Sequence, residues 1–352
     1  MSQPAVAAAG VWPQLPGLLL RDLKSSLILD YSCPSMLSGG EQRRQDCWPT
    51  CAMKRSAEKT VSRTKSCTEV VVSTTVTDVR LQLDQARRSG HVIGLVPTMG
   101  ALHAGHTSLI RQARDETGFV VVTIFVNPLQ FGPHEDFDAY PRTWDADLEI
   151  CRELDVDLIF RPTVADVYPA GSSTRVDVEG IGRLLEGQQR PGHFQGVATV
   201  VAKLFNIVQP DVAFFGQKDY QQQLLIRTMC RDLNLPIEIR TCPTVREPDG
   251  LALSSRNVYL SPTERSQAQV LSQSLTQACE QLSRGVCVAE VRSQLRDQLA
   301  SAPGVELEYA VVVDPLTLVE HNDPLPEYAV LVAARLGQTR LIDNMIAPAS
   351  GG

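Results

Sequence analysis

The amino-acid sequence predicts an α/β fold in which a parallel sheet with helices on both faces is joined to a smaller C-terminal α+β domain. Short apolar runs, typical of strands buried on both faces, alternate with helical patterns from Glu69 onward, and this alternation favours a parallel sheet. The composition changes near Arg246, beyond which helical stretches are followed by strand-rich ones. A chain of 352 residues is long enough to form two domains with hydrophobic cores of their own.

The elements of the first domain are predicted from the spacing of apolar residues. A strand at 70–72 is followed by an amphipathic helix at 76–89, in which Leu81 and Leu83 are expected to point partly inward. Further strands are predicted at 91–96, 119–126, 157–160, 211–215 and 237–245. The remaining helices are predicted at about 103–117, 143–154 and 197–208, with one more beginning at Tyr220. The segment 182–196 is predicted to be a loop.

The second domain is predicted to hold two helices and three strands. The helices are expected at 263–284 and 288–301, and the strands at 306–314, 328–334 and 339–345. The domain boundaries that follow are 68–245 for the larger domain and 246–352 for the smaller one.

Residues 1–67 differ from the rest of the chain. They contain nine Lys or Arg against five Asp or Glu, four of the nine cysteines, and no sustained periodicity. The apolar run at 18–20 is too short for a signal peptide, and a transit peptide should be poorer in acidic residues. We therefore predict a disordered N-terminal extension, with an overextended start as the alternative.

The composition excludes several classes of function. The formal net charge of -7 argues against a general nucleic-acid binder, which would need a basic face. No apolar run approaches the length of a membrane span. The nine cysteines are scattered, and no histidine lies near the closest pair, Cys47 and Cys51, to complete a zinc site. The sequence thus predicts a cytoplasmic protein with reduced thiols.

The strongest functional signal is the stretch 91–106, where an apolar strand ends in a turn followed by two histidines. Pro97 and Gly100 break the strand, and His103 and His106 follow just before a helical pattern. If the helix begins near His103, both imidazoles lie on one face of its first turn, beside unpaired backbone N–H groups and the positive end of the helix dipole. Histidine donors there could stabilise charge that develops on a phosphate.

Polar residues follow two further predicted strands, where ligands of parallel sheets bind. The amides of Asn127 and Gln130 suit a hydroxyl-rich acid, although either could instead cap a loop. Lys218 precedes a helix, where a cation is poorly placed unless an anion is present. Asp219 could cap that helix or help to hold Mg²⁺, and Gln222 could face the same pocket.

These motifs together resemble those of the pantothenate synthetase family. The blocks are P-T-M-G-A-L-H-A-G-H at 97–106, N-P-L-Q-F-G at 127–132, R-P-G-H-F at 190–194, G-Q-K-D-Y-Q-Q at 216–222 and S-S-R at 254–256. H-x-G-H after a first strand is also similar to the signature of the adenylyl-transferring superfamily that includes class I aminoacyl-tRNA synthetases. The resemblance covers about 69–346 and implies a Rossmann-like sheet.

The resemblance also implies which residues form the site. It places catalytic roles on His106, His103 and Lys218, and pantoate or β-alanine binding on Gln130, Gln222, Asn127, Arg190 and His193. It places ATP on Met99, Gly100, Ala101, Leu102, His103, Ala104, Gly105, His106, Gly216, Gln217, Lys218, Asp219, Val245, Leu253, Ser254, Ser255 and Arg256. Mg²⁺ is expected with the phosphates, with Asp219 as a candidate ligand, and family members are typically homodimers.

The activity implied is the ATP-dependent condensation of (R)-pantoate with β-alanine to pantothenate, AMP and diphosphate, through a pantoyl adenylate. One alternative is a nucleotidylyltransferase of the same fold, which would need a further basic cluster for a second phosphate, whereas this chain offers Asn127, Gln130 and Gln222. A non-catalytic nucleotide-binding module is the other alternative, and sensing would not require all five blocks.

Overall fold

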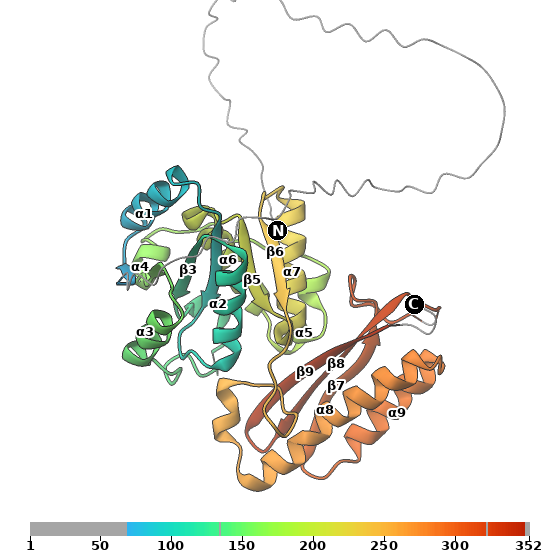
Figure 1. The fold of residues 1–352 in the computed structure, drawn as a ribbon. Helices are drawn as coiled ribbons and strands as arrows, with labels where there is room; N and C mark the ends of the chain where they lie inside the picture. Colours follow the sequence, from blue (N-terminus) through green and yellow to red (C-terminus); the bar gives the residue numbers. More distant parts are fainter. Residues whose placement is uncertain (1–68, 134, 322, 349–352) are drawn as a thin grey trace, which may run out of the picture. The chain divides into compact units, whose positions relative to one another are not determined.

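A computed structural model describes residues 69–133, 135–321 and 323–348 (Figure 1). The described residues form a six-stranded sheet and a three-stranded sheet, each with helices packed on it. The extension predicted for 1–67 lies outside the described residues, and the domain boundaries predicted at 68 and 246 stay predictions.

The larger sheet is parallel throughout, as the alternation of strands and helices predicted. Its strand order is β1-β4-β3-β2-β5-β6. The strands are β1 (Val71–Ser73), β2 (Ile93–Thr98), β3 (Phe119–Ile124), β4 (Leu158–Phe160), β5 (Val212–Gly216) and β6 (Glu238–Cys242). After β2, the strands β3 and β4 are added on one side of it, and β5 and β6 are then added on the other side. The strand order therefore reverses beside β2, which is where parallel sheets bind ligands.

Helices cover both faces of this sheet. On one face the hydrophobic core joins the sheet to α1 (Val76–Arg88), α6 (His193–Val208) and α7 (Tyr220–Asp232). On the other face it joins the sheet to α2 (Ala104–Glu116) and α3 (Trp144–Glu153). Shorter segments complete this part of the chain: α4 (Val164–Val167), α5 (Glu186–Gln189) and the 3-10 turns η1 (Pro128–Gln130), η2 (Ile181–Arg183) and η3 (Gln217–Asp219).

The structure corrects the sequence prediction at three places. Leu81 is 66% exposed, because the buried stripe of α1 is made by Val79, Leu83 and Ala86 at helical spacing. The segment 182–196 is not all loop, since it contains α5 and the first turn of α6, whose polar residues hid the helical pattern. The strand predicted at 237–245 ends at Cys242, where Pro243 cannot donate to the sheet.

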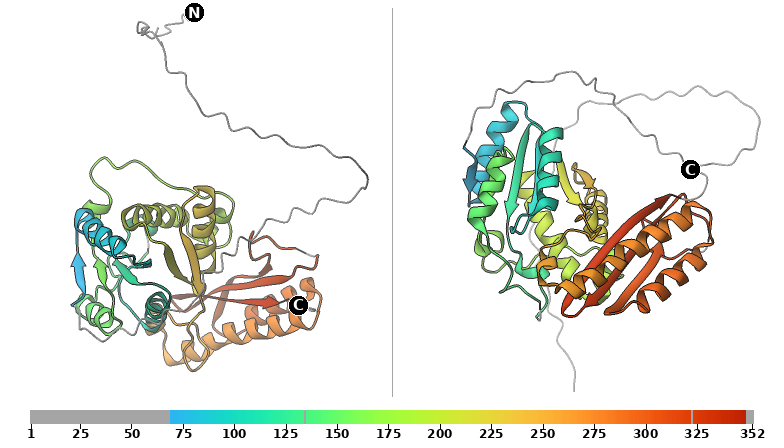
Figure 2. Two further views of the ribbon diagram at one scale, coloured as in Figure 1. Left: turned by 45° about the horizontal axis from the view of Figure 1, so that its top comes forward. Right: turned by 60° about the horizontal axis from the view of Figure 1, so that its bottom comes forward.

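The smaller sheet is antiparallel, in the order β7-β8-β9. Its strands are β7 (Val305–Val313), β8 (Glu327–Leu336) and β9 (Thr339–Pro348). The helices α8 (Pro262–Ser283) and α9 (Val288–Ala300) pack along one face of it and enclose a core of their own (Figure 2). Ser261 and Glu264 form a reciprocal capping box at the start of α8, after which Pro262 occupies the first helical position.

The remaining face of the smaller sheet contacts α7. Tyr220 and Leu224 from α7 share a hydrophobic cluster with Val311, Val313 and Leu331. The hydroxyl of Tyr220 donates to the carbonyl oxygen of Pro315 at 2.9 Å. This cluster places β9 beside η3, the turn that carries Lys218.

Candidate active site

A cavity of about 270 Å³ opens at the carboxyl ends of the parallel strands, where the switch in strand order predicts a ligand site. Residues from all five motif blocks line it: Met99, His103, Gly105, His106, Asn127, Gln130, Arg190, His193, Gly216, Lys218, Asp219, Gln222, Ser254, Ser255 and Arg256. The predicted site residues Val245 and Leu253, outside the blocks, line it too. Of the predicted site residues, Gly100, Ala101, Leu102, Ala104 and Gln217 do not line its wall. The fold thus brings blocks more than 100 residues apart to one cavity.

The two histidines lie together on the first turn of α2, as their spacing predicted. His103 is the N-cap residue, and its Nδ1 accepts a hydrogen bond from the Gly105 N–H at 3.1 Å. Nδ1 of His106 accepts one from the His103 N–H at 3.3 Å, and the two ring centroids are 4.1 Å apart. Gly105 is needed here, because a Cβ atom at this position would lie 2.9 Å from the His103 ring.

This arrangement fixes the tautomer of both rings. A neutral imidazole that accepts at Nδ1 carries its proton on Nε2 and donates from there. Burial, assisted by the neighbouring His103 ring, lowers the pKa of His106 to about 3, and burial with the nearby Lys218 ammonium lowers the pKa of His103. Near neutral pH the site therefore presents two uncharged N–H donors.

The loop between β2 and α2 is held by a carboxylate that the sequence analysis did not select. Asp147, on α3 and 2% exposed, accepts hydrogen bonds from the backbone N–H groups of Ala101 at 3.0 Å and Leu102 at 2.8 Å. Gly100 and Ala101 have positive φ angles of 85° and 50°, and the latter is unfavourable for a residue with a side chain. In the sequence Asp147 is one of several acids at a helix start, so no signal distinguished it.

Asn127 makes the loop-capping contact that its sequence allowed, and it also holds the side chain of Gln130. Asn127 is 1% exposed, accepts from the Leu129 N–H at 3.3 Å and from the Tyr168 hydroxyl at 2.9 Å, and donates to Gln130 Oε1 at 3.0 Å. Its amide thus caps η1 and holds the side chain of Gln130. Gln130 keeps its amide nitrogen at the cavity, 3.3 Å from the Met99 sulfur.

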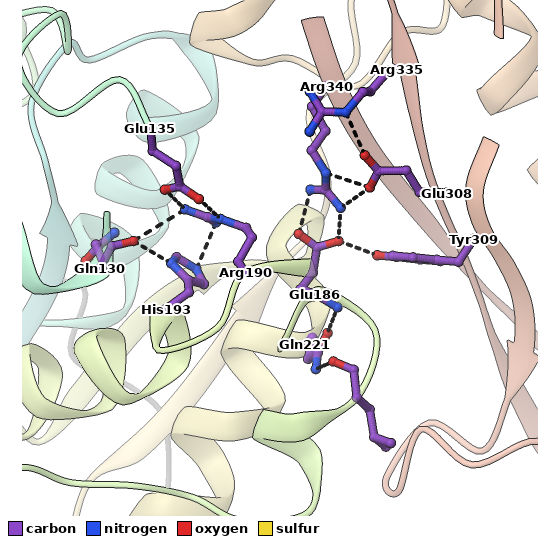
Figure 3. Close-up of polar contacts among 11 residues, drawn as sticks. Gln130, Glu135, Glu186, Arg190, His193, Gln221, Glu308, Tyr309, Arg335 and Arg340 are labelled. Atoms are coloured by element: carbon purple, nitrogen blue, oxygen red, sulfur yellow. Dashed lines mark hydrogen bonds and ion pairs between the residues drawn. The ribbon is translucent and has the colours of Figure 1, made fainter. Parts of the chain in front are cut away.

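Arg190 and His193 hold the backbone of Gln130 (Figure 3). His193 Nδ1 lies 2.8 Å from the Gln130 carbonyl oxygen, and its Nε2 lies 3.0 Å from the Arg190 guanidinium. Because the guanidinium can only donate, His193 accepts at Nε2 and donates from Nδ1. Arg190 also forms a two-pronged ion pair with Glu135, both distances being 2.7 Å. Both side chains therefore brace Gln130, and both also line the cavity.

We predict that the three histidines of the cavity make the protein less stable as the pH falls from 7.5 to 5. Burial and the Arg190 cation lower the pKa of His193 to about 4, and the pKa values of His103 and His106 are lowered too. Below about pH 6.5 the unfolded chain takes up protons at these histidines and the folded chain does not. The free energy of unfolding therefore falls by up to about 1.4 kcal/mol per pH unit for His106 and for His193, and by less for the more exposed His103. Urea unfolding should show a shallower decline for His193→Gln, with parallel curves above pH 7.5; identical slopes throughout would contradict this.

The short helix α5 is tied to the smaller sheet next to Arg190. Glu186, 7% exposed, accepts two hydrogen bonds from Arg340 of β9 at 2.7 Å and one from the Tyr309 hydroxyl at 2.8 Å (Figure 3). Burial and the Glu186 carboxylate raise the pKa of Tyr309, so the phenol stays protonated and donates. Gln221 of α7 accepts from the Glu186 N–H at 3.1 Å. None of these partners was selected in the sequence, because each bond joins distant segments.

Lys218 and Asp219 lie on η3, between β5 and α7, and both line the cavity. Asp219 is the N-cap residue of α7, but its side chain makes no capping hydrogen bond. Of its two predicted roles, the cap is therefore not observed. Among the described residues no carboxylate lies within ion-pair distance of Lys218. An unpaired ammonium at a helix start is costly without an anion, which makes η3 a candidate phosphate site.

Ser254, Ser255 and Arg256 also line the cavity, at the start of η4 (Ser255–Tyr259). The Ser254 hydroxyl accepts from the Arg256 N–H at 3.3 Å. The Arg256 guanidinium lies 3.1 Å from Asp136, in an ion pair whose side chains are 40% and 32% exposed. Such an exposed pair contributes at most about 1 kcal/mol, so an anion of higher charge can compete for Arg256.

Comparison with known proteins decides the family. The family model described as pantoate-beta-alanine ligase matches residues 71–346. This chain belongs to the pantoate-beta-alanine ligase family. The match begins two residues after the first described residue and includes all five motif blocks, so it confirms the resemblance read from the sequence.

Similar proteins and similar solved structures agree with that assignment. The chain is 48% identical over 273 residues to the pantothenate synthetase of Acetivibrio thermocellus, covering 77% of this chain and 97% of the relative. It is 52% identical over 291 residues to that of Nocardioides sp., covering 78% and 84%. A crystal structure of pantothenate synthetase from Thermus thermophilus superimposes with a TM-score of 0.75 at 48% identity, covering 78% of this chain and 99% of that one.

A second structural relative was solved with ligands. The pantoate-beta-alanine ligase of Francisella tularensis, complexed with beta-gamma ATP and beta-alanine, has a TM-score of 0.63 at 36% identity and covers 79% of this ligase and 97% of its own chain. The ligase family match favours amide formation over the nucleotidylyltransferase and the non-catalytic binding module. Among the described residues of this ligase, no helix is long and apolar enough to cross a membrane.

Proposed function

We propose that this ligase activates the carboxylate of (R)-pantoate with ATP and then transfers the pantoyl group to β-alanine. A carboxylate oxygen attacks the α-phosphorus of ATP, the bond to the bridging oxygen breaks, and diphosphate leaves. The amine of β-alanine then attacks the carbonyl carbon of the pantoyl adenylate, the C–O bond to AMP breaks, and the amine loses a proton. The observation that carries this proposal is one cavity lined both by candidate phosphate donors (His103, His106 and Lys218) and by the uncharged amides of Gln130 and Gln222.

The phosphate donors suit a reaction in which charge gathers on phosphate oxygens. His103 and His106 present fixed N–H groups at the start of α2, and Lys218 supplies an unpaired cation at the start of α7. Donors held in place before the reaction need no reorganisation as the charge develops. Ser254, Ser255 and Arg256 line the same cavity and would hold the remaining phosphates.

The adenylate must be kept from water, because a mixed anhydride hydrolyses readily when it is exposed. Part of the cavity wall is apolar and could enclose the adenylate. Its side chains come from the ends of β2, β3 and β5 and from α6: Pro97, Phe125, Val197, Val200, Val201, Leu204, Phe214 and Phe215. These side chains suit the gem-dimethyl body of pantoate, while Gln130 and Gln222 provide hydrogen bonds for its oxygens.

Mg²⁺ is part of the proposal as a counter-ion of the ATP phosphates. The described residues contain no group of three or more His, Cys, Asp or Glu side chains that could hold a metal on their own. Asp219 fits a smaller role, since its carboxylate lines the cavity next to Lys218 and makes no capping bond. One carboxylate together with phosphate oxygens is a common way to hold Mg²⁺, which would neutralise charge on the phosphates.

We further propose that the protein acts as a homodimer in the cytoplasm, as the family resemblance implies. The described cysteines, five in number, are all free thiols, which suits a reducing compartment. Size-exclusion chromatography with light scattering would test the dimer, and a single protomer at micromolar concentration would rule it out.

The activity itself is tested by incubating the protein with ATP, pantoate and β-alanine and measuring AMP and pantothenate. Both products should appear only when pantoate and β-alanine are present together, and pantoate alone should support exchange of labelled diphosphate into ATP. Release of diphosphate with the nucleotide joined permanently to the substrate would instead indicate a nucleotidylyltransferase. ATP binding without turnover would indicate a binding module.

Replacing Gln130 or Gln222 by Ala is expected to raise the KM for pantoate by about fivefold or more, since each buried hydrogen bond contributes about 1 kcal/mol or more. ATP binding should change far less, because neither amide lies among the phosphate donors. Gln223 offers a matched control: it is 4% exposed and accepts from the Thr241 hydroxyl at 2.9 Å, away from the cavity. Steady-state kinetics should leave Gln223→Ala with a normal pantoate KM. Equal losses for pantoate and ATP would assign Gln130 and Gln222 a structural role.

A further inference from the structure

Two adjacent residues in β9 reach the two candidate phosphate loops, although they lie in the smaller sheet. Asn344 is 2% exposed and donates from Nδ2 to the carbonyl oxygens of Gln217 at 3.0 Å and Lys218 at 2.8 Å. Its Oδ1 accepts from the Gln217 side-chain amide at 3.3 Å. All three of these hydrogen bonds therefore hold η3, the turn that carries Lys218.

Asp343 holds the other loop. It is 3% exposed and forms a bidentate ion pair with Arg246, at 2.6 and 2.9 Å. Arg246 begins a tight hairpin in which it pairs with Ala252, and the Leu253 N–H donates to the Val245 carbonyl oxygen at 2.9 Å. The Arg246 guanidinium also donates to the Gly250 carbonyl oxygen at 3.0 Å. The hairpin ends at Leu253, and Ser254 and Arg256 follow it directly in the chain.

The two anchors are coupled to each other. The Asn344 N–H donates to Asp343 Oδ1 at 2.7 Å, and Arg246 donates to the Asn344 carbonyl oxygen at 3.4 Å. One short piece of β9 therefore sets the position of Lys218 relative to Ser254, Ser255 and Arg256. Neither anchor lines the main cavity, although both line a small neighbouring pocket together with Lys218. The polar side-chain atoms of both are already bonded to η3, to Arg246 or to each other, so they act on the two loops through these bonds.

We propose that Asn344 and Asp343 are positioning residues for adenylate formation, which hold the Lys218 turn and the loop at 254–256 at the spacing that the triphosphate requires. The inference rests on the proposed function of this cavity. A misplacement of a catalytic group by about 1 Å can cost about a hundredfold in rate. Asn344 should matter most for the first half-reaction, because the leaving diphosphate is handled there and not in amide formation.

The test compares the two half-reactions in Asn344→Ala and Asn344→Asp. Single-turnover adenylate formation at saturating ATP and pantoate should fall by roughly tenfold to a hundredfold, while amide formation from supplied pantoyl adenylate should change by less than about threefold. The aspartate is the sharper variant, since its oxygens cannot donate to the Gln217 and Lys218 carbonyl groups and repel them. Asn344→Ser replaces either variant that does not fold, and the same split is expected of it.

A double-mutant cycle with Lys218→Met separates positioning from general damage. If Asn344 acts through Lys218, Asn344→Ala should cost less than about threefold in adenylate formation when Lys218 is already methionine. Asn206→Asp is the matched control, because the Asn206 amide donates to the Ala202 carbonyl oxygen at 2.8 Å on α6, outside the cavity. It should leave both half-reactions unchanged.

Three results would overturn the inference: a wild-type rate of adenylate formation in Asn344→Ala, equal losses in both half-reactions, or full additivity with Lys218→Met. Failure of the proposed function looks different, since the wild-type protein itself would then form no adenylate. Asp343→Asn extends the test to the second loop, where the loss in adenylate formation should persist in the Lys218→Met background.

Discussion

Replacing Lys218 by methionine is expected to slow the formation of pantoyl adenylate by about a hundredfold to a thousandfold, the usual cost of removing one preorganised donor to a developing charge. Lys218 lines the cavity on η3 and has no ion-pair partner among the described residues, so its positive charge is free for phosphate oxygens. Methionine retains much of the length and the apolar stem but removes the charge. Single-turnover assays with saturating ATP should show the loss.

Two variants sharpen the Lys218 prediction. Lys203→Met is the matched control, because this lysine lies over the Tyr168 ring at 5.7 Å and does not line the cavity. Its rate should stay within about twofold of the wild type, as is usual for surface changes. Lys218→Arg keeps the positive charge but replaces the compact ammonium by a larger, planar guanidinium. It should therefore recover only part of the wild-type rate of adenylate formation. Full adenylate formation in Lys218→Met would remove this residue from the catalytic step.

The fold was predictable because its signals are local. Apolar runs of strand length alternate with helical patterns, and each of the six parallel strands was expected within a few residues of its place. The errors have local causes as well. Leu81 lies about 200° around α1 from Leu83, so the two could not both face the core, and the first turn of α6 was hidden by its polar residues.

The cavity residues were predictable where a motif keeps them together in the sequence. His103, His106, Gln130 and Lys218 all come from short blocks that follow strand ends, and the cavity unites them. What the sequence could not indicate are the residues that support them from a distance. Asp147 lies 45 residues from Leu102, and Asn344 lies 126 residues from Lys218, so only the folded chain pairs them.

The same limit applies to residues whose chemistry was predicted but whose partners were not. Arg190 is predicted to contact substrate, which stays a prediction; the structure adds that Glu135 forms an ion pair with it and that the Gln130 backbone accepts from it. Its place as a support for Gln130 depends on a carboxylate 55 residues away. A basic residue in a motif therefore identifies the site more reliably than it identifies the role, because the role depends on which acid the fold brings beside it.

His106→Ala is expected to produce the largest loss confined to chemistry: adenylate formation should fall by about a hundredfold to a thousandfold while ATP affinity changes little. Its Nδ1 accepts from the His103 N–H, so its Nε2–H is free to donate to a non-bridging oxygen of the α-phosphate. Because its pKa is lowered to about 3, it donates as a neutral ring, and adenylate formation should not titrate with His106 between pH 6 and 9.

The control for His106 must account for its part in capping α2. Loss of the bond from the His103 N–H costs stability of about 0.5–2 kcal/mol, as for other caps, which urea unfolding would measure separately. His106→Gln keeps an acceptor and an N–H donor and should recover part of the rate. Amide formation from supplied pantoyl adenylate should suffer less than adenylate formation, because AMP leaves with a charge that its phosphate already carries. A His106→Ala enzyme with normal adenylate formation, or with a defect only in ATP binding, would exclude His106 from transition-state stabilisation and leave it as the residue that accepts from the His103 N–H in the capping box of α2.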